Sequence, residues 1–433
     1  MAQIERLADV VDWRLCLGCG ACEYICPDDK VELLDFLAEG IRPVTRGGDC
    51  GGCRDCLDVC PGIRSDYRLG SAPDSTILDS QDGLLDEWGP IVGIWEGFAT
   101  DPEIRFKGSS GGVLTALAAY CVERVGMHGV LQIAPHPDDP VRSQTRLSRE
   151  RLDLLEATGS RYAPASVCNG LDLIQGAPAP CAVVGKPSEI AGLRNAMRMR
   201  PELARKVGVS LSFFCAETPS TQATRALVEK MGADPDRLAD LRYRGLGWPG
   251  HFAPTPLGAS EPIGRMTYEE SWAILQSSRP WATHLWPDGS GELADISCGD
   301  PWYEAPDGTN PGFSLVVARN ELGRKIVEGA IADGYIDLEP AEAWKLRRSQ
   351  RGLLRRKSLI EGRRLASRLL GVPITSLPGL ELGRLWQRQS WRERLRTILG
   401  TLRRMLSRGY MKRSTLDRTR AQEVPRPRSP IRP

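Results

Sequence analysis

The middle of the chain, from about residue 90 to residue 345, alternates short apolar runs with longer segments of helical periodicity. The short runs are rich in β-branched residues and are expected to be strands, at 91–99, 129–135, 180–187 and 207–217. Helices are expected at 112–125, 188–197 and 221–232. Strands that alternate with helices are typical of an α/β domain with a largely parallel sheet. We therefore expect an α/β fold for this part, and an α+β organisation for the whole chain.

The end of the chain, beyond residue 345, is basic and helical in pattern. From Trp391 to Leu406 apolar residues recur at helical spacing with arginines between them, which predicts an amphipathic helix. The last segment, 423–433, is rich in proline and arginine and is expected to be disordered. We therefore expect a tail over 346–433 that is helical at first and disordered at its end.

The beginning of the chain differs from its middle and its end, since residues 1–70 hold eight of the 13 cysteines. A polar stretch at 71–89, rich in serine, aspartate and glycine, is expected to be a linker. The sequence thus predicts a small N-terminal domain over 1–70 and a larger body over 90–345.

Composition places the chain among soluble globular proteins, with 26% charged and 41% hydrophobic residues over 433 positions. No apolar run reaches the roughly 18 residues that a membrane span needs, and the N-terminus lacks the apolar core of an export signal. We therefore expect a cytoplasmic protein, in which cysteines are metal ligands or core thiols rather than disulfides.

The net charge of +2 conceals an asymmetry. Residues 345–433 carry 25 Lys/Arg and five Asp/Glu, whereas residues 1–344 carry 32 and 50. A basic tail of this kind fits peripheral contact with a membrane surface or a partner protein, and it equally fits docking on the acidic body. Nucleic acid is a third interpretation, but the tail has neither an aromatic platform nor a recognition motif, and we expect no nucleic-acid partner.

Two cysteine runs, at 16–27 and 50–61, share the spacing C-x2-C-x2-C-x3-C-P. Three cysteines of such a run bind one 4Fe–4S cluster and the fourth binds the other cluster. Cluster I is then expected on Cys16, Cys19, Cys22 and Cys60, and cluster II on Cys50, Cys53, Cys56 and Cys26. Zinc is the alternative, although zinc sites usually consist of two C-x2-C pairs with a longer spacer. The runs resemble bacterial two-cluster ferredoxins, which implies a ferredoxin-like domain that carries electrons to the rest of the chain.

A glycine-rich segment follows the strand expected at 91–99 and opens the helix expected at 112–125. Its backbone N–H groups and the helix dipole would favour an anion, with a lysine beside them. The residues concerned are Lys107, Gly108, Ser109, Ser110, Gly111 and Gly112. The segment is neither a dinucleotide fingerprint nor a P-loop, and a glycine turn before a buried helix is an equal alternative.

Five further segments carry unusual combinations of residues: "ATGSRYAPAS", "VVGKPSEIAGLR", "SFFCAETPS", "RYRGLGWPG" and "WPDGSGELADISCGDPWY". Together with "GSSGGVLTAL" they resemble, in order over about residues 10–345, the coenzyme F-420 hydrogenase/dehydrogenase beta-subunit family. The last three are most similar to a bacterial branch found among polysaccharide biosynthesis genes. The resemblance implies an iron–sulfur flavoprotein that passes electrons between 4Fe–4S clusters, FAD and a small organic acceptor.

The same resemblance suggests roles for particular residues. The glycine-rich segment would hold the FAD pyrophosphate, and Lys186 would lie at the electron-rich side of the flavin. Asp295 and Asp300 would donate protons or hold the substrate, although a solvated loop is an equal alternative for both acids. The other residues that would line the flavin are Gly159, Ser160, Tyr162 and Gly185.

The chain also departs from the family pattern. Many relatives have a cysteine at the position of Ser188 and a C-x2-C pair where this chain has Thr283 and Trp286, and none of these three side chains can replace a thiolate on iron. Cluster or thiol chemistry at those positions is therefore expected to be absent or altered. The remaining cysteines, Cys121, Cys168, Cys181, Cys215 and Cys298, are expected to be buried thiols.

These observations favour a cytoplasmic oxidoreductase with two 4Fe–4S clusters and FAD, supplied with electrons by ferredoxin or another redox protein and acting on a small molecule. An electron-transfer subunit or scaffold without a substrate pocket is the alternative. A third possibility is a binding protein that has kept its clusters and lost the flavin.

Overall fold

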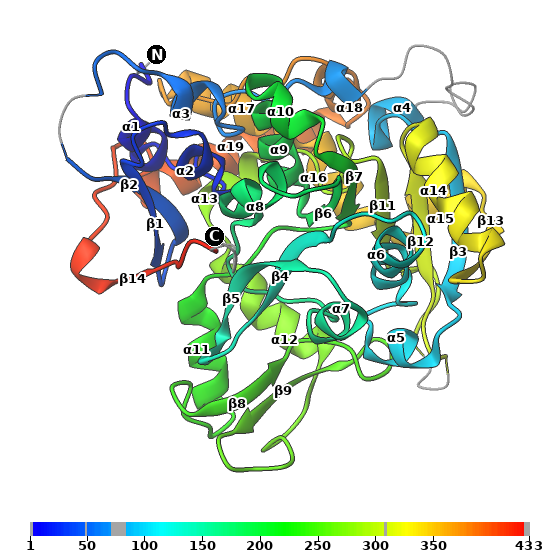
Figure 1. Ribbon diagram of the computed structural model, residues 1–433. Coiled ribbons are helices and arrows are strands. Elements are labelled where there is room, and N and C mark those ends of the chain that lie inside the picture. Colours follow the sequence, from blue (N-terminus) through cyan, green and yellow to red (C-terminus); the bar gives the residue numbers. More distant parts are fainter. Residues whose placement is uncertain (1–2, 48–49, 71–83, 307–309, 428–433) are drawn as a thin grey trace.

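An eight-stranded mixed sheet forms the centre of the computed structural model, which describes residues 3–47, 50–70, 84–306 and 310–427 (Figure 1). The strand order is β13-β3-β12-β11-β7-β6-β4-β5. The strands are β3 (Gly93–Ala99), β4 (Val130–His136), β5 (Asp139–Ser148), β6 (Cys181–Gly185), β7 (Val207–Phe213), β11 (Ile296–Gly299), β12 (Ser314–Ala318) and β13 (Ile336–Pro340).

Only the middle of this sheet is parallel. β4, β6, β7 and β11 run in the same direction, whereas β5, β12, β3 and β13 pair antiparallel with their neighbours. Two residues connect β4 to β5, and a connection that short joins antiparallel strands. The α/β fold is therefore confirmed, but the largely parallel sheet expected from the sequence is corrected to a parallel centre with antiparallel edges.

Helices pack against both faces of the sheet, and β6 contributes side chains to both. Cys181 and Val183 belong to the core shared with α8 (Leu171–Gln175) and α9 (Pro187–Met199). Ala182 and Val184 belong to the core shared with α6 (Val113–Glu123), α7 (Arg151–Glu156) and α14 (Glu321–Ala332). This period of two is typical of a strand that is buried on both faces.

A smaller antiparallel sheet forms a lobe below the central sheet in Figure 1. It consists of β8 (Leu238–Arg242), β9 (His251–Pro256) and β10 (Met266–Thr267), and it packs with α11 (Thr221–Lys230) and α12 (Tyr268–Leu275). The core of the lobe contains Leu227, Leu241, Tyr243, Phe252 and Leu275. The lobe therefore brings two parts of the chain beside the central sheet. These are the residues that follow Tyr243 and one face of α12.

The N-terminal cysteine segment is packed on the body rather than held apart from it. It comprises α1 (Leu7–Asp12), α2 (Ala21–Ile25), the hairpin of β1 (Val31–Phe36) and β2 (Gly40–Thr45), and α3 (Asp55–Asp58). Ile25 and Cys22 share one core with Val183 and Ile190 of the body. The Ser166 hydroxyl also donates a hydrogen bond to the carbonyl oxygen of Gly18, at 2.6 Å.

The end of the expected linker is structured. Residues 84–88 form α4 (Leu84–Trp88), and its two buried apolar side chains, Leu84 and Trp88, pack against Ile94 and Leu315 of the central sheet. The remaining part, 71–83, lies outside the described residues. Other short helices are α5 (Pro102–Lys107), α10 (Pro201–Ala204), α13 (Trp281–Leu285), η1 (Tyr67–Gly70), η2 (Val167–Gly170) and η3 (Gln276–Ser278).

The basic tail folds back over the rest of the molecule. This agrees with one of the three interpretations of its charge, docking on the chain's own body. Met405 is buried in a core with Val10, Cys16 and Cys60 of the cysteine segment. The tail consists of α15 (Ala343–Ser349), α16 (Arg351–Ser358), α17 (Ile360–Leu369), α18 (Leu382–Gln387), α19 (Trp391–Ser407), η4 (Arg418–Arg420) and β14 (Ala421–Glu423).

The expected disorder of 423–433 is wrong for its first part. β14 pairs antiparallel with β1, and the Val424 N–H donates a hydrogen bond to the carbonyl of Leu33 at 3.1 Å. Arg426 then forms ion pairs with Asp29 and Asp172, at 2.5 and 2.9 Å. The edge of the hairpin and these two acids hold the segment in place, and 428–433 lies outside the described residues.

Candidate active site

A cavity of about 960 Å³ opens at the carboxyl ends of β6, β7 and β11. Ligands of α/β proteins usually bind at this edge of the sheet, and the volume is at the upper end of the ~300–1,000 Å³ typical of small-molecule and cofactor sites. The wall is completed by the start of α6, by α12 from the small lobe, and by α15 to α17 from the tail. Four separate parts of the sequence therefore meet around one space.

The glycine-rich segment forms part of this wall. Gly108, Ser109, Ser110 and Gly112 line the cavity together with the first turn of α6, so that the N-terminus of an 11-residue helix faces the space. Ser110 donates a hydrogen bond from its hydroxyl to the carbonyl of Phe313, which fixes the loop against β12. The backbone of this segment is therefore held where it can approach an anionic ligand.

Two residues of the same segment do not line the cavity. A Cβ at Gly111 would stand 2.7 Å from the carbonyl oxygen of Gly97, and its N–H already donates to the Ser314 hydroxyl at 3.0 Å. Gly111 therefore serves close packing of the loop on the sheet. The ammonium group of Lys107 instead pairs with Glu103 at 2.9 Å, away from the cavity.

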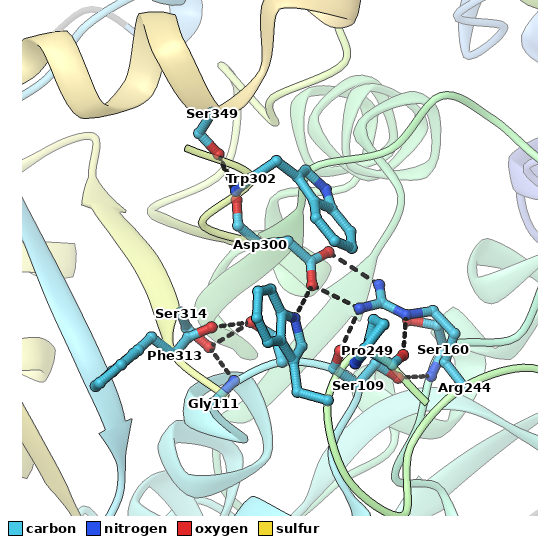
Figure 2. Close-up of polar contacts among 12 residues, drawn as sticks. Ser109, Gly111, Ser160, Arg244, Pro249, Asp300, Trp302, Phe313, Ser314 and Ser349 are labelled. Carbon is cyan, nitrogen blue, oxygen red and sulfur yellow. Dashed lines mark hydrogen bonds and ion pairs between the residues drawn. The ribbon is translucent and has the colours of Figure 1, made fainter. Parts of the chain in front are cut away.

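Arg244 links the glycine-rich segment to Asp300 (Figure 2). Its guanidinium binds both carboxylate oxygens of Asp300, at 2.9 and 2.6 Å, and also donates to the carbonyl of Ser109. Burial lowers the pKa of Arg244, but the adjacent Asp300 carboxylate outweighs burial and raises that pKa above its usual value. Trp248 donates its indole N–H to Asp300 at 3.3 Å. Asp300 lies in the cavity wall, where both of its carboxylate oxygens bind Arg244, and its role toward a substrate stays a prediction.

Asp295 lies elsewhere and does not line the cavity. Its carboxylate accepts hydrogen bonds from the backbone N–H and hydroxyl of Ser210, at 2.7 and 2.6 Å, from Arg194 at 2.9 Å and from Asn320 at 2.7 Å. Burial raises its pKa, but Arg194 and these hydrogen bonds hold the pKa below its usual value. The structure thus places Asp295 as an acceptor that ties β7 to the start of α14, outside the reach of a ligand in the cavity.

Lys186 is buried at the cavity wall and is the N-cap residue of helix α9. Its ammonium group lies 2.8 Å from the Glu189 carboxylate and 3.2 Å from the carbonyl of Ala165. Burial lowers the pKa of Lys186, but Glu189 and Glu217 outweigh burial and raise it. Lys186 is therefore a charged group that remains paired inside the protein.

Glu217 is a second acid of the cavity, and sequence reasoning did not identify it. The residue is buried and has a left-handed backbone with φ of 71°, and its Oε1 has no hydrogen-bond partner among the described residues. Burial raises the pKa of its carboxyl group above the usual value, against the opposing effect of Lys186 and Arg356. A buried carboxyl with a free oxygen in a cavity wall is suited to holding a proton.

Aromatic rings form another part of the wall. Tyr268 and Trp302 are stacked with ring centroids 5.2 Å apart and planes 5° apart, and Tyr162 contacts Trp272 at 5.0 Å. Three of the residues expected to line a flavin, Gly159, Ser160 and Tyr162, line the cavity, and Gly185 lies at the end of β6. Stacked aromatic side chains suit a planar ring system.

The eight cysteines of the two runs gather into two sets of four. Cys16, Cys19, Cys22 and Cys60 line one small apolar space and are buried. In the other set, burial and the nearby thiols Cys53, Cys26 and Cys50 raise the pKa of Cys56 to about 11, and Cys50 and Cys53 are exposed. Each set has the thiol donors that a 4Fe–4S cluster needs, and the assignment of clusters to the sets stays a prediction. Within the described residues, no three Cys, His, Asp or Glu side chains converge as ligands of a single metal ion.

Helix α9 joins the buried cysteine set to the cavity. It begins beside Lys186 at the cavity wall, and two turns later Gly192 lies against Cys19, where a Cβ would stand 3.0 Å from the sulfur. Cys168 also lies against Cys19 and donates its thiol hydrogen to the backbone carbonyl of Glu189 at 3.2 Å. The buried cysteine set and the cavity are thus neighbours.

The other thiols and histidine near the cavity are uncharged. Burial raises the pKa of Cys215 and of Cys298 to about 12, so both are protonated thiols in the wall. Burial and nearby arginines lower the pKa of His284 to about 3. At the positions where relatives have cysteine, Ser188, Thr283 and Trp286 are all buried.

Comparison with known proteins places this architecture in a family. Residues 94–172 match the model of the coenzyme F420 hydrogenase/dehydrogenase beta subunit N-terminus, and residues 180–343 match the model of its C terminus. The coenzyme F420 hydrogenase subunit beta of Methanosarcina barkeri is 27% identical over 57% of this chain and 81% of its own length. The coenzyme F420-dependent sulfite reductase of Methanocaldococcus jannaschii is 24% identical over 83% of this chain, which spans about half (52%) of that longer protein.

A solved structure agrees on the fold. A chain of the F420-reducing [NiFe] hydrogenase complex from Methanosarcina barkeri superposes with a TM-score of 0.51 at 22% identity, over 67% of this chain and 97% of its own. Both family models end by residue 343, so the helices of the tail that reach the cavity lie beyond them.

Proposed function

The chain belongs to the coenzyme F420 hydrogenase/dehydrogenase beta-subunit family, and we propose that it is an iron–sulfur flavoprotein that passes electrons between two 4Fe–4S clusters, FAD and a small organic molecule. The family and its oxidoreductase relatives support electron-transfer chemistry. The observation that carries the finer proposal is the path from exposed cysteines, through buried cysteines, along α9 to a large cavity.

The cavity offers what FAD requires. The N-terminus of α6 and the N–H groups around Gly112 would hold the diphosphate, and the stacked rings of Tyr268 and Trp302 would contact the planar part. Bound flavin exchanges single electrons with iron–sulfur centres and electron pairs with organic substrates. Arg244 keeps the loop in place through Ser109 and Asp300.

Within this scheme the side chains have distinct tasks. Lys186 places a positive charge at the cavity wall and keeps it there through its pairing with Glu189. Glu217 holds a proton next to the bound molecule, because burial favours its neutral form. Asp295 is not a proton donor in this scheme, since it lies outside the cavity.

The exposure of the second cysteine set indicates where electrons enter. Cys50 and Cys53 are exposed, whereas the first set is buried next to α9, so a redox protein such as ferredoxin would dock over residues 50–53. The alternative of an electron-transfer subunit uses the same surface, and the names of the relatives, a hydrogenase subunit among them, favour such an assembly. The cavity favours an organic substrate in this chain itself.

The outer face of α19 suggests peripheral contact with an anionic membrane. Trp391, Leu399 and Leu406 are 64%, 55% and 55% exposed, and arginines flank them on both sides. Apolar side chains bordered by basic ones are suited to the interface of a bilayer. Among the helices of the described residues, none combines the length and apolarity needed to cross a membrane.

Chemical analysis of anaerobically purified protein tests the proposal. We expect about eight irons per chain, by the ligand count of two clusters, together with about one FAD released on denaturation. Iron without flavin in protein that was reconstituted with FAD would overturn the flavoenzyme proposal, and about four irons would overturn the two-cluster assignment.

A further inference from the structure

One part of the cavity wall is built by arginines of the tail. Arg348 of α15, Arg351 and Arg356 of α16, and Arg363 of α17 line it, and Arg279, which precedes α13, lies beside them. Four of these five arginines follow residue 343, where the family model of the C terminus ends. Most of this basic wall therefore comes from residues that the two family models do not cover.

Arg355 also lines the wall and pairs with Glu393 at 2.6 Å, but three other arginines of the wall, Arg279, Arg356 and Arg363, donate to carbonyl groups instead. Arg356 donates to the carbonyl of Ala216 at 3.0 Å, Arg279 to the same carbonyl at 2.7 Å, and Arg363 to the carbonyl of His284 at 2.6 Å. Among the described residues, none of the three arginines pairs with a carboxylate. Other arginines of the tail do form such pairs, as Arg368 does with Glu361 at 3.1 Å.

The arginines are also close enough to repel one another. Burial and the neighbouring charges of Arg356, Arg404, Arg279 and Arg355 lower the pKa of Arg363 to about 10. The Nε–H of Arg356 is buried, and no group in the described part of the chain accepts a hydrogen bond from it. Glu217 and Asp288 are the acids that favour the charge of Arg356, and burial outweighs them. An arrangement that keeps several cations together at a cost in stability indicates that an anion binds there.

The arginine wall that would bind this anion is separate from the glycine-rich segment. Figure 2 shows Ser349 and the glycine-rich segment on either side of Asp300. Asp300 accepts from Ser349 through its backbone carbonyl and binds Arg244 through its carboxylate, and Arg244 in turn holds Ser109. The start of the tail helices and the segment expected to hold the flavin diphosphate therefore approach Asp300 from different directions.

We propose that Arg279, Arg356 and Arg363 form a subsite for a phosphate or diphosphate group carried by the organic substrate. The planar guanidinium group donates two parallel hydrogen bonds to phosphate oxygens, and several such groups together match a multiply charged anion. This inference rests on the proposed function, because it takes the glycine-rich segment to be filled by flavin. The substrate class is accordingly a phosphorylated organic molecule.

Titration of the flavin-loaded, anaerobic protein with inorganic pyrophosphate tests the subsite. We expect saturable binding with about one pyrophosphate per chain, and at least about tenfold weaker binding in the double variant Arg356→Gln/Arg363→Gln. Arg368→Gln is the matched control, because Arg368 lies on α17 as Arg363 does but is already paired with Glu361. This variant should bind pyrophosphate like the unaltered protein. The variant Arg356→Lys/Arg363→Lys keeps both positive charges but loses the paired hydrogen-bond donors of the guanidinium groups. We therefore expect its affinity for pyrophosphate to lie between that of the unaltered protein and that of the glutamine variant.

The outcomes separate this inference from the proposed function. Absence of pyrophosphate binding to the unaltered protein, or equal binding by the glutamine variant with an unchanged unfolding temperature, overturns the subsite. If the glutamine variant loses its flavin, the arginines hold the cofactor and the substrate subsite is overturned. If the unaltered protein takes up no flavin at all, the proposed function fails, while pyrophosphate binding that depends on the arginines still supports an anion site.

Discussion

Gly192 of helix α9 lies against Cys19, so closely that a Cβ at residue 192 would stand 3.0 Å from the Cys19 sulfur. Lys186, the N-cap residue of the same helix, lies in the cavity wall. A rigid helix without a side chain at this point therefore connects the buried cysteine set to the place where a substrate would be reduced or oxidised. Because of this contact, the last part of the proposed electron path, from the buried cysteines to the cavity, is short and fixed.

The contact at Gly192 leads to a prediction for cluster I. In Gly192→Val the side chain would displace Cys19, and we expect a loss of about four irons per chain, with the second cluster retained. Iron analysis and electron paramagnetic resonance of the reduced protein measure this. Gly383→Ala in α18 is the control, since a Cβ there meets nothing within 4 Å, and its iron content should be unchanged. Full iron content in Gly192→Val would contradict the placement of cluster I.

The Arg244–Asp300 pair leads to a prediction for flavin binding. Asp300→Asn leaves the buried Arg244 charge without its partner, and we expect a loss of about 3 kcal/mol of stability, the low end for breaking a buried pair. Arg244→Lys removes the link to Ser109 as well, and the protein should lose flavin during gel filtration. Arg225→Lys, which alters a surface pair with Asp236, serves as the control. Unchanged flavin retention in Arg244→Lys would show that the loop does not need this link.

Glu217 leads to a prediction about pH. Its pKa is raised in the folded protein, so the folded state binds a proton more tightly than the unfolded state, and stability falls as pH rises from the unfolded value near 4.5 through the raised value. Glu217→Gln should therefore unfold at a higher temperature than the unaltered protein at neutral pH, and the difference should vanish below about pH 4. Thermal unfolding over a pH series checks this, with the exposed Glu229→Gln as the control. A destabilised Glu217→Gln at neutral pH would contradict a raised pKa of Glu217 in the folded protein.

The exposed face of α19 leads to a prediction about membranes. We expect the protein to float with vesicles that contain anionic lipids and to stay behind with zwitterionic ones, because arginines border the apolar residues. The double variant Trp391→Gln/Leu399→Gln changes only exposed side chains and should lose flotation while it keeps its fold. Equal flotation of the variant would exclude this face of α19 as the contact.

The sequence predicts local features of this protein well and long-range ones poorly. The cysteine spacing and the glycine-rich turn can each be recognised from about a dozen consecutive residues. Glu217 and Arg244 share a cavity with the arginines of the tail, which follow them by more than 100 residues, only because the chain folds around one space. Periodicity carries no signal for such a meeting, although the surplus of basic residues in the tail pointed to a partner with negative charge.

The pair Asp295 and Asp300 shows a second limit. Both acids belong to one short motif, but Asp295 precedes β11 and Asp300 follows it. Since ligands bind at the carboxyl ends of the central strands, Asp300 lies in the cavity wall and Asp295 lies at the other end of the strand. The direction of a strand in the sheet, which the motif does not reveal, decides which acid is near the ligand.

The path from the exposed cysteines to the cavity is tested by the rate at which bound flavin is reduced. Flavin-loaded protein is mixed anaerobically with reduced ferredoxin, and the flavin absorbance is followed in the unaltered chain and in Cys53→Ser, which lacks a ligand of the exposed cluster. We expect the fast phase of flavin reduction to be lost in Cys53→Ser although its flavin content is unchanged. Equal rates in the two proteins would contradict electron entry through the cysteine segment.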